Sequence, residues 1–402
     1  MLNERLGKVL VPQSKHYSWT KAVDVLGIGN DNMLSIQVDE NFRMDINHLK
    51  NTIDGLISKK IPILAVMAVV GTTEEGAVDE LQEIVELRRE YEKHGVSFYL
   101  HVDAAYGGYA RTVFLNDKNE FMGWDNLKET LHDLDILHQE TDWPAKEVYE
   151  AFKAMPEADS ITIDPHKMGY VPYAAGAVVF KDKRVLDLVS YFAAYIEEKG
   201  ASDPELLGSY ILEGSKAGAA AAAVWAAHLV VPLNVTGYGA IIGRGIEGAN
   251  RFYNSLITEK NFDAGGRRFK VEPLTKPDFN IVDFSFNEIG NSSLKMMNEF
   301  NRKIYDLCSF HAGPVYADDW ITSKTDLSIK NYGDAPQEFT SRLGITEREW
   351  EQVHDVYVLR SCVLTPFLVK HTTYEAYWRN FMKTMRKKIA RIVESESLKK
   401  AA

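Results

Sequence analysis

The chain has 402 residues, with 46 basic and 57 acidic side chains and a formal net charge of −11. Hydrophobic residues make up 45% and charged residues 26%, which argues against a disordered chain, because such chains have few apolar residues for their charge. An acidic balance without basic blocks argues against a nucleic-acid partner, since phosphate contacts need clustered Lys and Arg. The length exceeds what one hydrophobic core usually serves, so we expect two domains.

The two cysteines, Cys308 and Cys362, lie far apart and form neither a disulfide framework nor a zinc-binding pattern. We expect two buried thiols in a protein of a reducing compartment. The first residues contain no apolar core of signal-peptide length, and no window approaches the roughly 20 apolar residues of a membrane span. These features predict a cytoplasmic protein with no membrane partner.

Strand and helix patterns alternate through the first half of the chain. The apolar, branched run Ile61–Val70 predicts a strand that is buried on both faces. A helical stripe follows over Val78–Gly95, where the glycine provides a natural stop. Further strands are expected at Val96–Val102, Ser160–Asp164 and Gly176–Phe180. This order is typical of a mostly parallel sheet covered by helices.

Three further segments of the first domain, residues 1–267, are predicted to be wholly or largely helical. The acidic stretch Asn116–Glu157 interrupts the strand pattern and is interpreted as a largely helical surface insertion. Helices are also expected at Lys183–Lys199 and Glu205–Leu229. The second of these contains the Ala-rich run Ala217–Ala227, which predicts a helix packed closely on a sheet.

From about Arg268 the pattern changes to that of a smaller α+β domain, residues 268–402. Strands are predicted at 269–273, 281–286 and 357–364, and helices at 291–310 and 374–393. The polar stretch Thr322–Gly344 has scattered Gly, Pro and Asn residues. Such a composition predicts a mobile loop.

Two motifs at predicted strand ends favour a chemical function. The segment His101–Gly108 (HVDAAYGG) places Asp103 at the carboxyl end of a buried strand, the edge of an α/β sheet where ligands bind. A carboxylate there can hold a pyridinium N–H, and the two alanines that follow leave room for a flat ring. The segment Asp159–Gly169 ends another strand with Lys167, which suits a Schiff-base nucleophile. Singly, each residue could be a capping carboxylate or a solvated lysine, but their order on successive strands favours chemistry.

Four ordered motifs resemble those of the group II pyridoxal-phosphate-dependent amino-acid decarboxylases. They are Ser14–Ala22 (SKHYSWTKA), Gly71–Thr73 (GTT), His101–Tyr106 (HVDAAY) and Asp164–Lys167 (DPHK). The DPHKMG sequence, the following Ala175–Phe180 segment and the acidic insertion are most similar to bacterial tyrosine decarboxylases. The C-terminal half is similar more diffusely, through Val358–Ser361 and the helices around it.

The resemblance implies an α/β fold, with an aspartate-aminotransferase-like (fold type I) large domain and a smaller α+β domain. It also implies a pyridoxal 5'-phosphate cofactor and a homodimer with the active site between the subunits. Lys167 would form the Schiff base, Asp103 would keep the pyridine nitrogen protonated, and His16 would stack on the ring. Tyr173 would donate a proton to the substrate Cα. The other implied site residues are Thr73 and Ala105 along the ring, Ser160 and His166 near the phosphate, and Ser361 in the substrate pocket.

Several of these residues also have a plain structural interpretation. A lone histidine such as His16 is usually a surface or core residue, Ser160 could simply begin a strand, and Ser361 could be a buried hydroxyl without a ligand. His132 and His138 lie among acidic residues, but their spacing fits no helical pair of metal ligands. A solvated acidic face is therefore expected there, and no metal site.

The implied reaction is the decarboxylation of an aromatic L-amino acid, with L-tyrosine converted to tyramine and CO2. The sequence does not separate tyrosine from dopa, phenylalanine, aspartate or glutamate as the substrate. An aminotransferase would use the same lysine and aspartate, but the HYS and DPHK motifs argue against that class.

A non-catalytic remnant is the remaining alternative. Members of the family carry a phosphate-binding turn and a dimer-forming arm upstream of the HYS motif, whereas His16 is preceded here by 15 residues. We therefore expect the chain to correspond to the C-terminal two-thirds of such an enzyme. On its own it is expected to bind the cofactor weakly, to have an open sheet edge and to aggregate.

Overall fold

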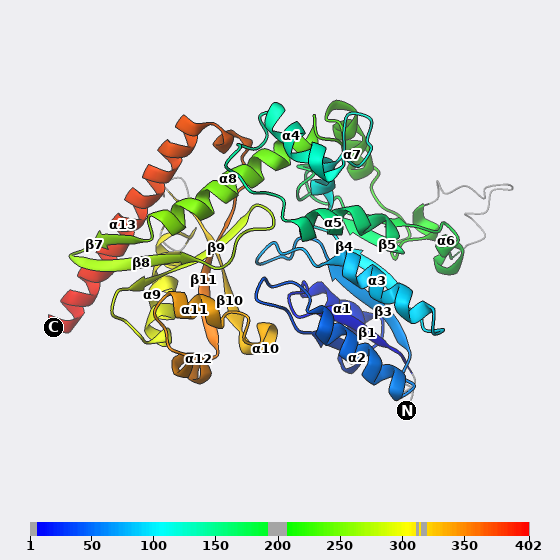
Figure 1. The fold of residues 1–402 in the computed structure, drawn as a ribbon, viewed down its shortest axis with the longest axis horizontal. Coiled ribbons are helices and arrows are strands. Elements are labelled where there is room, and N and C mark those ends of the chain that lie inside the picture. The colour runs from blue at the N-terminus through cyan, green and yellow to red at the C-terminus, as the bar shows by residue number, and fades with distance from the viewer. Residues whose placement is uncertain (1–5, 192–206, 311–312, 315–319, 402) are drawn as a thin grey trace.

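The computed structural model describes residues 6–191, 207–310, 313–314 and 320–401. Two sheets organise these residues, and Figure 1 shows them in two lobes that lie side by side. The first sheet has six strands in the order β2-β1-β3-β4-β5-β6, and the second sheet has five in the order β10-β11-β9-β8-β7. The mixed α/β architecture expected from the sequence is confirmed.

The first sheet is parallel except at one edge. Its strands are β1 (Lys8–Pro12), β2 (Met33–Ile36), β3 (Ile63–Val69), β4 (Tyr99–Asp103), β5 (Ser160–Ile163) and β6 (Ala177–Phe180). Only β6 runs antiparallel to its neighbour, and its Val178 and Val179 are half exposed at the sheet edge. The four strands predicted from branched apolar runs are confirmed. The short strands β1 and β2 have no comparable run and are not predicted.

Amphipathic helices cover the first sheet. They are α1 (Ser18–Val25), α2 (Ile46–Ser58), α3 (Leu81–Glu92), α4 (Trp124–Asp133) and α5 (Lys146–Ala154), with 3-10 helices η1 (Asn30–Asn32), η2 (Gly108–Phe114) and η3 (Met155–Glu157). Asp45 caps α2 by accepting a hydrogen bond from the His48 N–H at 2.9 Å. Leu49, Ile53 and Leu56 of α2 form an apolar stripe that is buried in the core of this lobe.

The acidic segment 116–157 is not confined to the surface. Its Trp143 and Phe152 are buried in the same core cluster as the central strands. The Trp143 indole N–H also donates to the Asp278 carbonyl at 2.8 Å, which ties the segment to the second lobe. The prediction of a surface insertion is therefore wrong for the apolar side of this segment, because its two helices are amphipathic and only their polar side faces solvent.

Two of the expected helices differ in the structure. The helix α6 covers Val185–Val189, and the rest of the predicted helix falls largely on residues 192–206, outside the described part. A short 3-10 helix, η4 (Leu207–Ser209), is followed by turns, so the helix predicted from Glu205 begins only at α7 (Ala219–Val230).

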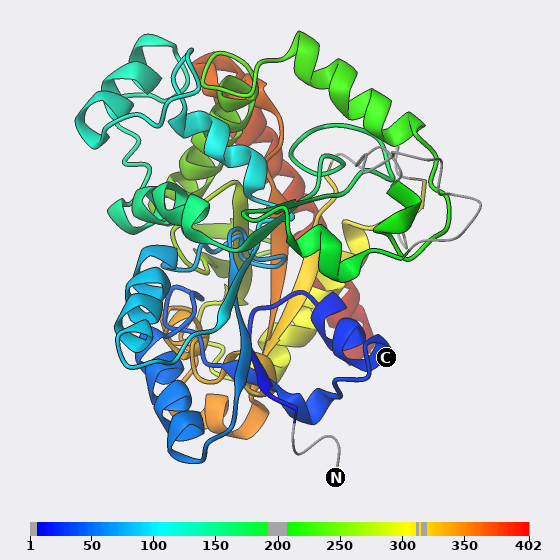
Figure 2. The ribbon, with the colours of Figure 1, turned by 90° about the vertical axis from the view of Figure 1, so that its right-hand side faces the viewer.

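Helix α7 is not packed on a sheet. None of its residues is buried, and its Trp225 is 65% exposed. Figure 2 shows this helix (bright green) on the outside of the lobe. The prediction of close packing is wrong. An Ala-rich composition predicts an apolar helix with small side chains, but it does not predict whether another element packs against that helix.

The second sheet is antiparallel throughout. Its strands are β7 (Asn261–Ala264), β8 (Arg267–Pro273), β9 (Ile281–Glu288), β10 (Ser323–Ser328) and β11 (Asp355–Cys362). The helices of this part are α8 (Tyr238–Thr258), α9 (Leu294–Leu307), α10 (Ile329–Tyr332), α11 (Gln337–Arg342), α12 (Glu347–Val353) and α13 (His371–Ala401), with the 3-10 helix η7 (Pro366–Val369). The strands and the two long helices predicted after residue 268 are confirmed.

The predicted mobile loop Thr322–Gly344 is wrong. Strand β10 lies in this segment and pairs with β11 along its whole length, and two short helices follow it. Leu327, Tyr332, Phe339 and Leu343 are buried apolar residues that hold the segment on the core. They are too widely spaced among polar residues to give a clear periodic pattern.

The two lobes are joined by packing and by ion pairs. Helix α8 packs on η2 of the first lobe and on η7 and β8 of the second, and Figure 1 shows it running between the lobes. The Arg43 guanidinium binds both oxygens of Asp278 at 2.7 and 3.0 Å, and Asp278 also accepts from the Val78 N–H at 3.0 Å. Within the described residues, no helix is both long and apolar enough to cross a membrane.

A buried acid lies in the seam between the lobes. Glu75 is 4% exposed, and one of its oxygens accepts a hydrogen bond from Thr72 Oγ1 at 2.9 Å. Burial raises the pKa of Glu75 from 4.5 to about 7, because the charged carboxylate loses its hydration. The pKa of the nearby buried Asp283 is raised for the same reason. Folding thus shifts both acids towards their neutral form relative to the unfolded chain.

We expect Glu75→Gln to weaken the pH dependence of stability. Between its unfolded and folded pKa values the native state holds the Glu75 proton and the unfolded chain releases it, so stability falls as the pH rises through this window. Glutamine mimics the neutral acid. The free energy of unfolding of the variant should therefore exceed that of the parent chain by up to about 3 kcal/mol at about pH 8. At about pH 4 the two free energies should be equal.

Urea unfolding at both pH values measures this difference in the free energy of unfolding. The matched control is Glu86→Gln on the exposed side of α3, which should not change the pH dependence. If the free energy of unfolding changed with pH equally in Glu75→Gln and in the parent chain, the proposed titration of Glu75 would be contradicted.

Candidate active site

Five of the residues predicted for the site converge at the carboxyl edge of the first sheet. A cavity of about 290 Å³ at this edge is lined by His16, Thr73, Asp103, Ala105 and Lys167. They come from the segments that follow β1, β3, β4 and β5. Because these strands are parallel, their carboxyl ends meet at one edge, where ligands bind in α/β sheets.

Lys167 lies in the turn that leaves β5. Its backbone N–H donates to the Asp164 carbonyl at 3.0 Å, and its Nζ lies 3.0 Å from Asp164 Oδ2. The Lys167 side chain is 31% exposed and that of Asp164 17%, so the ion pair is partly shielded from water. Asp164 is not among the predicted site residues, although the DPHK spacing (i, i+3) already places it on one turn with Lys167.

Asp103 is the last residue of β4 and is held between two strands. It pairs with Val69 of β3 on one side and with Thr162 of β5 on the other. Its Oδ2 accepts a hydrogen bond from the Trp19 indole N–H at 2.9 Å, and its Oδ1 accepts from the Ala105 N–H at 3.2 Å. Trp19 lies in the quoted SKHYSWTKA motif, but that motif alone gives no sign of this contact.

His16 lies just before α1, at the rim of the cavity. Its Nδ1 is 2.8 Å from Ser18 Oγ. Burial and the positive charge of Lys167 lower the pKa of His16, so its imidazole is neutral at neutral pH. A neutral, flat imidazole can lie against a flat aromatic ligand without bringing a second positive charge beside Lys167.

The loop that carries Thr73 is fixed by both lobes. Gly71 has a φ of +88°, and a Cβ there would lie 3.0 Å from the Phe279 ring and 3.1 Å from the Gly107 nitrogen. From the second lobe, the Arg360 guanidinium donates to the Glu74 carbonyl at 2.9 Å and to the Thr73 carbonyl. Position 71 of the Gly71–Thr73 turn thus has a backbone conformation that only glycine adopts without strain.

The other predicted site residues lie elsewhere. Ser160 is buried at the start of β5, and its hydroxyl is 2.7 Å from His101 Nδ1. The His166 Nδ1 donates to the Ala175 carbonyl, and the imidazole lies 4.1 Å from the Tyr173 ring between centroids. Tyr173 is 80% exposed. None of these three side chains lines the Lys167 cavity, and their predicted roles stay predictions.

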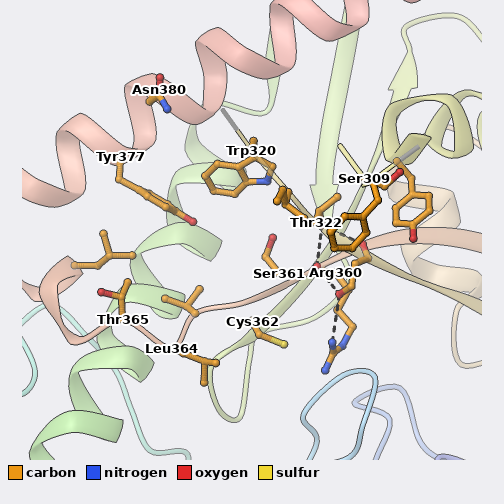
Figure 3. A pocket seen from close by; sticks show the side chains of 16 residues that line it. Ser309, Trp320, Thr322, Arg360, Ser361, Cys362, Leu364, Thr365, Tyr377 and Asn380 are labelled. Atoms are coloured by element: carbon orange, nitrogen blue, oxygen red, sulfur yellow. Dashed lines mark hydrogen bonds between the residues drawn. The ribbon is translucent and has the colours of Figure 1, made fainter. Parts of the chain in front are cut away.

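Ser361 lines a different and larger cavity of about 750 Å³ in the second lobe. In Figure 3 its hydroxyl points into this cavity, opposite Trp320 and Tyr377. Ser361 is 8% exposed, and its hydroxyl has no hydrogen-bond partner among the described residues. Arg360 lines the same cavity and also bonds Thr73, so it lies between the two cavities.

The cysteines differ in their surroundings. Cys308 is buried as expected, and the two cysteines form no disulfide in the described part of the chain. Cys362 is exposed, because it lies at the wall of the larger cavity beside Ser361. The prediction of two buried thiols is therefore wrong for Cys362.

The residues of the smaller cavity fit a pyridoxal-type cofactor. A primary amine, a carboxylate held by two donors and a neutral imidazole line the same space. The amine suits an aldehyde, the carboxylate suits a protonated ring nitrogen, and Ala105 leaves room for a flat ring.

Comparison with protein families gives two matches along the chain. Residues 1–122 match the pyridoxal-dependent decarboxylase conserved domain, and residues 248–389 match the C-terminal domain of tyrosine decarboxylase. The first match contains His16, Thr73, Asp103 and Ala105, and the second contains Ser361.

Among characterised proteins, the chain is 47% identical to the L-tyrosine decarboxylase of Enterococcus faecalis and 49% identical to that of Enterococcus faecium. Both alignments cover 97% of this chain, but only 63% and 64% of the relatives. The enzyme of the same name from Levilactobacillus brevis is 47% identical over 98% of this chain and 63% of its own length. The chain thus spans less than two-thirds of these relatives.

Solved structures show the same fold at low sequence identity. Oryza sativa TDC with PLP and tryptamine matches with a TM-score of 0.65 at 16% identity, over 96% of this chain and 64% of that one. Mouse CSAD matches with a TM-score of 0.62 at 17% identity, over 95% and 63%. The architecture is that of fold type I, as expected. In sequence, residues 1–122 match the pyridoxal-dependent decarboxylase conserved domain, and 97% of the chain is similar to part of the L-tyrosine decarboxylases of two Enterococcus species.

Proposed function

We propose that the protein decarboxylates an aromatic L-amino acid with pyridoxal 5'-phosphate, and that its substrate is L-tyrosine, which yields tyramine and CO2. The observation that carries this proposal is the convergence of Lys167, Asp103 and His16 on one cavity at the sheet edge. The relatives with 47 to 49% identity, which are named L-tyrosine decarboxylases, support the choice of substrate. Each turnover consumes one proton, because a C–H bond replaces the C–carboxylate bond.

Three residues would hold the cofactor. Lys167 would bind its aldehyde carbon through Nζ, Asp103 would face its pyridine nitrogen, and His16 would cover one face of the ring. When bound, the cofactor supplies an electron sink for the electron pair that the departing carboxylate leaves behind. The protein residues then decide which bond is broken and where charge is stabilised.

The electrostatics of the cavity suit this task. The Asp103 carboxylate is fixed before any ligand binds, so it can stabilise a protonated ring nitrogen without reorganisation. Asp164 Oδ2 lies 3.0 Å from the Nζ of Lys167 and holds this side chain in the cavity. The neutral His16 ring shields the reacting face from water, which strengthens the interactions of these charges.

Ser361 is proposed to contact the side chain of the substrate. Its unpartnered hydroxyl opens into a cavity with aromatic walls, which suits a phenol ring with a polar end. Arg360 separates this cavity from that of Lys167, so one substrate would have to pass beside the Arg360 side chain. Tyr173 stays our proposed proton donor to the substrate Cα, and Ser160 and His166 stay proposed neighbours of the cofactor phosphate.

We also propose that the protein is a cytoplasmic homodimer with its active site between the subunits. Apolar side chains are exposed on β6 and α7, among them Val178, Val179, Trp225 and Val230. Exposed apolar side chains of this kind favour a covering partner. Among the described residues, neither cysteine is part of a disulfide, which supports a reducing compartment. Sedimentation equilibrium measures the oligomeric state, and a monomer at all concentrations would contradict the dimer.

Lys167→Ala should abolish cofactor attachment. The purified chain is mixed with pyridoxal 5'-phosphate, and its visible absorbance and the tyramine formed from L-tyrosine are measured. We expect a protein-bound absorbance band and tyramine with the parent chain, and neither with the variant, because no other amine lines the cavity among the described residues. Lys183→Ala, at an exposed lysine, is the control and should keep both. A parent chain without a band would contradict the cofactor assignment.

Asp103→Asn should keep the shape of the site but remove its charge. We expect kcat/KM for L-tyrosine to fall about 10²- to 10³-fold, the usual effect of removing one preorganised electrostatic contact. Steady-state kinetics with saturating cofactor measures this loss. A fall below about threefold would show that the carboxylate does not support the reaction.

Ser361→Ala should reduce the preference for L-tyrosine over L-phenylalanine. Only the phenol can hydrogen-bond to Ser361 Oγ, so kcat/KM should fall for tyrosine and stay constant for phenylalanine. Ser341→Ala, at an exposed serine of α11, is the control. An equal effect on both substrates would exclude a contact with the phenol.

A further inference from the structure

We propose that Trp19 is a positioning residue that fixes the Asp103 carboxylate against the cofactor ring. This inference rests on the proposed function, in which Asp103 faces the ring nitrogen. Trp19 lies in the first turn of α1, whereas Asp103 lies 84 residues later at the end of β4. The contact between them therefore joins two separate segments of the cavity wall.

The two donors to Asp103 leave its carboxylate little freedom to rotate. The Trp19 indole N–H bonds Oδ2 at 2.9 Å, and the Ala105 N–H bonds Oδ1 at 3.2 Å. An indole nitrogen only donates, so Oδ2 must be the acceptor in this bond. Each oxygen keeps a further lone pair, and Asp103 is one of the residues that line the cavity. The orientation of the carboxylate is thus set before a ligand arrives.

Trp19 is itself held by packing. Its ring packs against the buried cluster of Val9, Val11, Ala65 and Met67 on the first sheet. Its edge also meets the imidazole of His101, with ring centroids 5.5 Å apart and an interplanar angle of 66°.

His101 is fixed in turn by strand β5. Its Nδ1 is 2.7 Å from Ser160 Oγ, and its Nε2 is 3.1 Å from Thr162 Oγ1. Burial lowers the pKa of His101, so one of its nitrogens donates and the other accepts at neutral pH. A network of fixed groups thus runs from Ser160 and Thr162 through His101 and Trp19 to Asp103.

A backbone hydrogen bond from Trp19 also positions His16. The Trp19 backbone N–H donates to the His16 carbonyl at 3.2 Å, so the two residues share one turn of the chain. Because the Trp19 ring is held on the sheet, this turn holds the His16 segment beside Asp103. Trp19 would therefore position both the group that faces the ring nitrogen and the group that covers the ring.

The test compares two tryptophan variants that each lose one indole–carboxylate hydrogen bond. Trp19→Phe keeps most of the packing but removes the donor to Asp103. Trp350→Phe removes an equivalent donor, since the Trp350 indole N–H bonds Asp334 Oδ1 at 2.8 Å in the second lobe. Asp334 does not line the Lys167 cavity, so this variant controls for a general loss of stability.

The dissociation constant of pyridoxal 5'-phosphate and the pH dependence of its protein-bound absorbance band are measured for both variants. We expect Trp19→Phe to raise the dissociation constant about tenfold, as is typical when an outer hydrogen bond to a ligand-binding group is lost. The pH dependence of the band should also shift. Trp350→Phe should change neither, although both variants should lower Tm.

A double-mutant cycle separates positioning from packing. In an Asp103→Ala background the indole has no carboxylate to orient, so Trp19→Phe should change the dissociation constant less than about twofold. An undiminished effect in that background would overturn the inference, as would a Trp19→Phe protein that binds like the parent chain. If the parent chain shows no bound cofactor at all, the proposed function falls, and this inference falls with it.

Discussion

Parallel pairing of β3, β4 and β5 is the constraint on which the site depends. The strand register places Asp103 beside Val69 of β3 and Thr162 of β5. This pairing fixes the position of the carboxylate at the sheet edge. The turns that leave β3 and β5 then bring Thr73 and Lys167 to the cavity that Asp103 lines. Buried branched side chains on both faces hold this register, because a slip would disrupt their packing against the covering helices. Burial in the core therefore determines the geometry of the chemical groups.

Polar contacts complete what the sheet begins. Trp19 and Ala105 orient Asp103, Asp164 holds the amine of Lys167, and Arg360 reaches across from the second lobe to the Thr73 turn. The bonds from Trp19 and Arg360 join segments that are distant in sequence. The contacts of Ala105 and Asp164 are local and orient the side chains of Asp103 and Lys167. The cavity is thus built from several short segments, and their relative positions are fixed by hydrogen bonds that leave few degrees of freedom before a ligand binds.

The sequence predicts those parts of the molecule whose patterns are local. Strand β3 is evident from its branched run, and Asp103 and Lys167 are evident from their positions after predicted strands. The Trp19–Asp103 contact is not evident, because it depends on how α1 lies on the sheet. Strand β10 is missed because its single buried leucine, Leu327, gives no alternation without its partner strand. The exposure of α7 is missed because composition does not reveal what covers a helix.

The bonds from Arg360 have a mechanical consequence. Arg360 belongs to β11 of the second sheet, yet its guanidinium donates to two backbone carbonyls of the turn that forms one wall of the Lys167 cavity. Any rotation of one lobe against the other must either break these bonds or carry the turn along. Relative movement of the two lobes would thus be transmitted to the wall of the cavity. A chromophore bound beside Lys167 would report such domain motion through its spectrum.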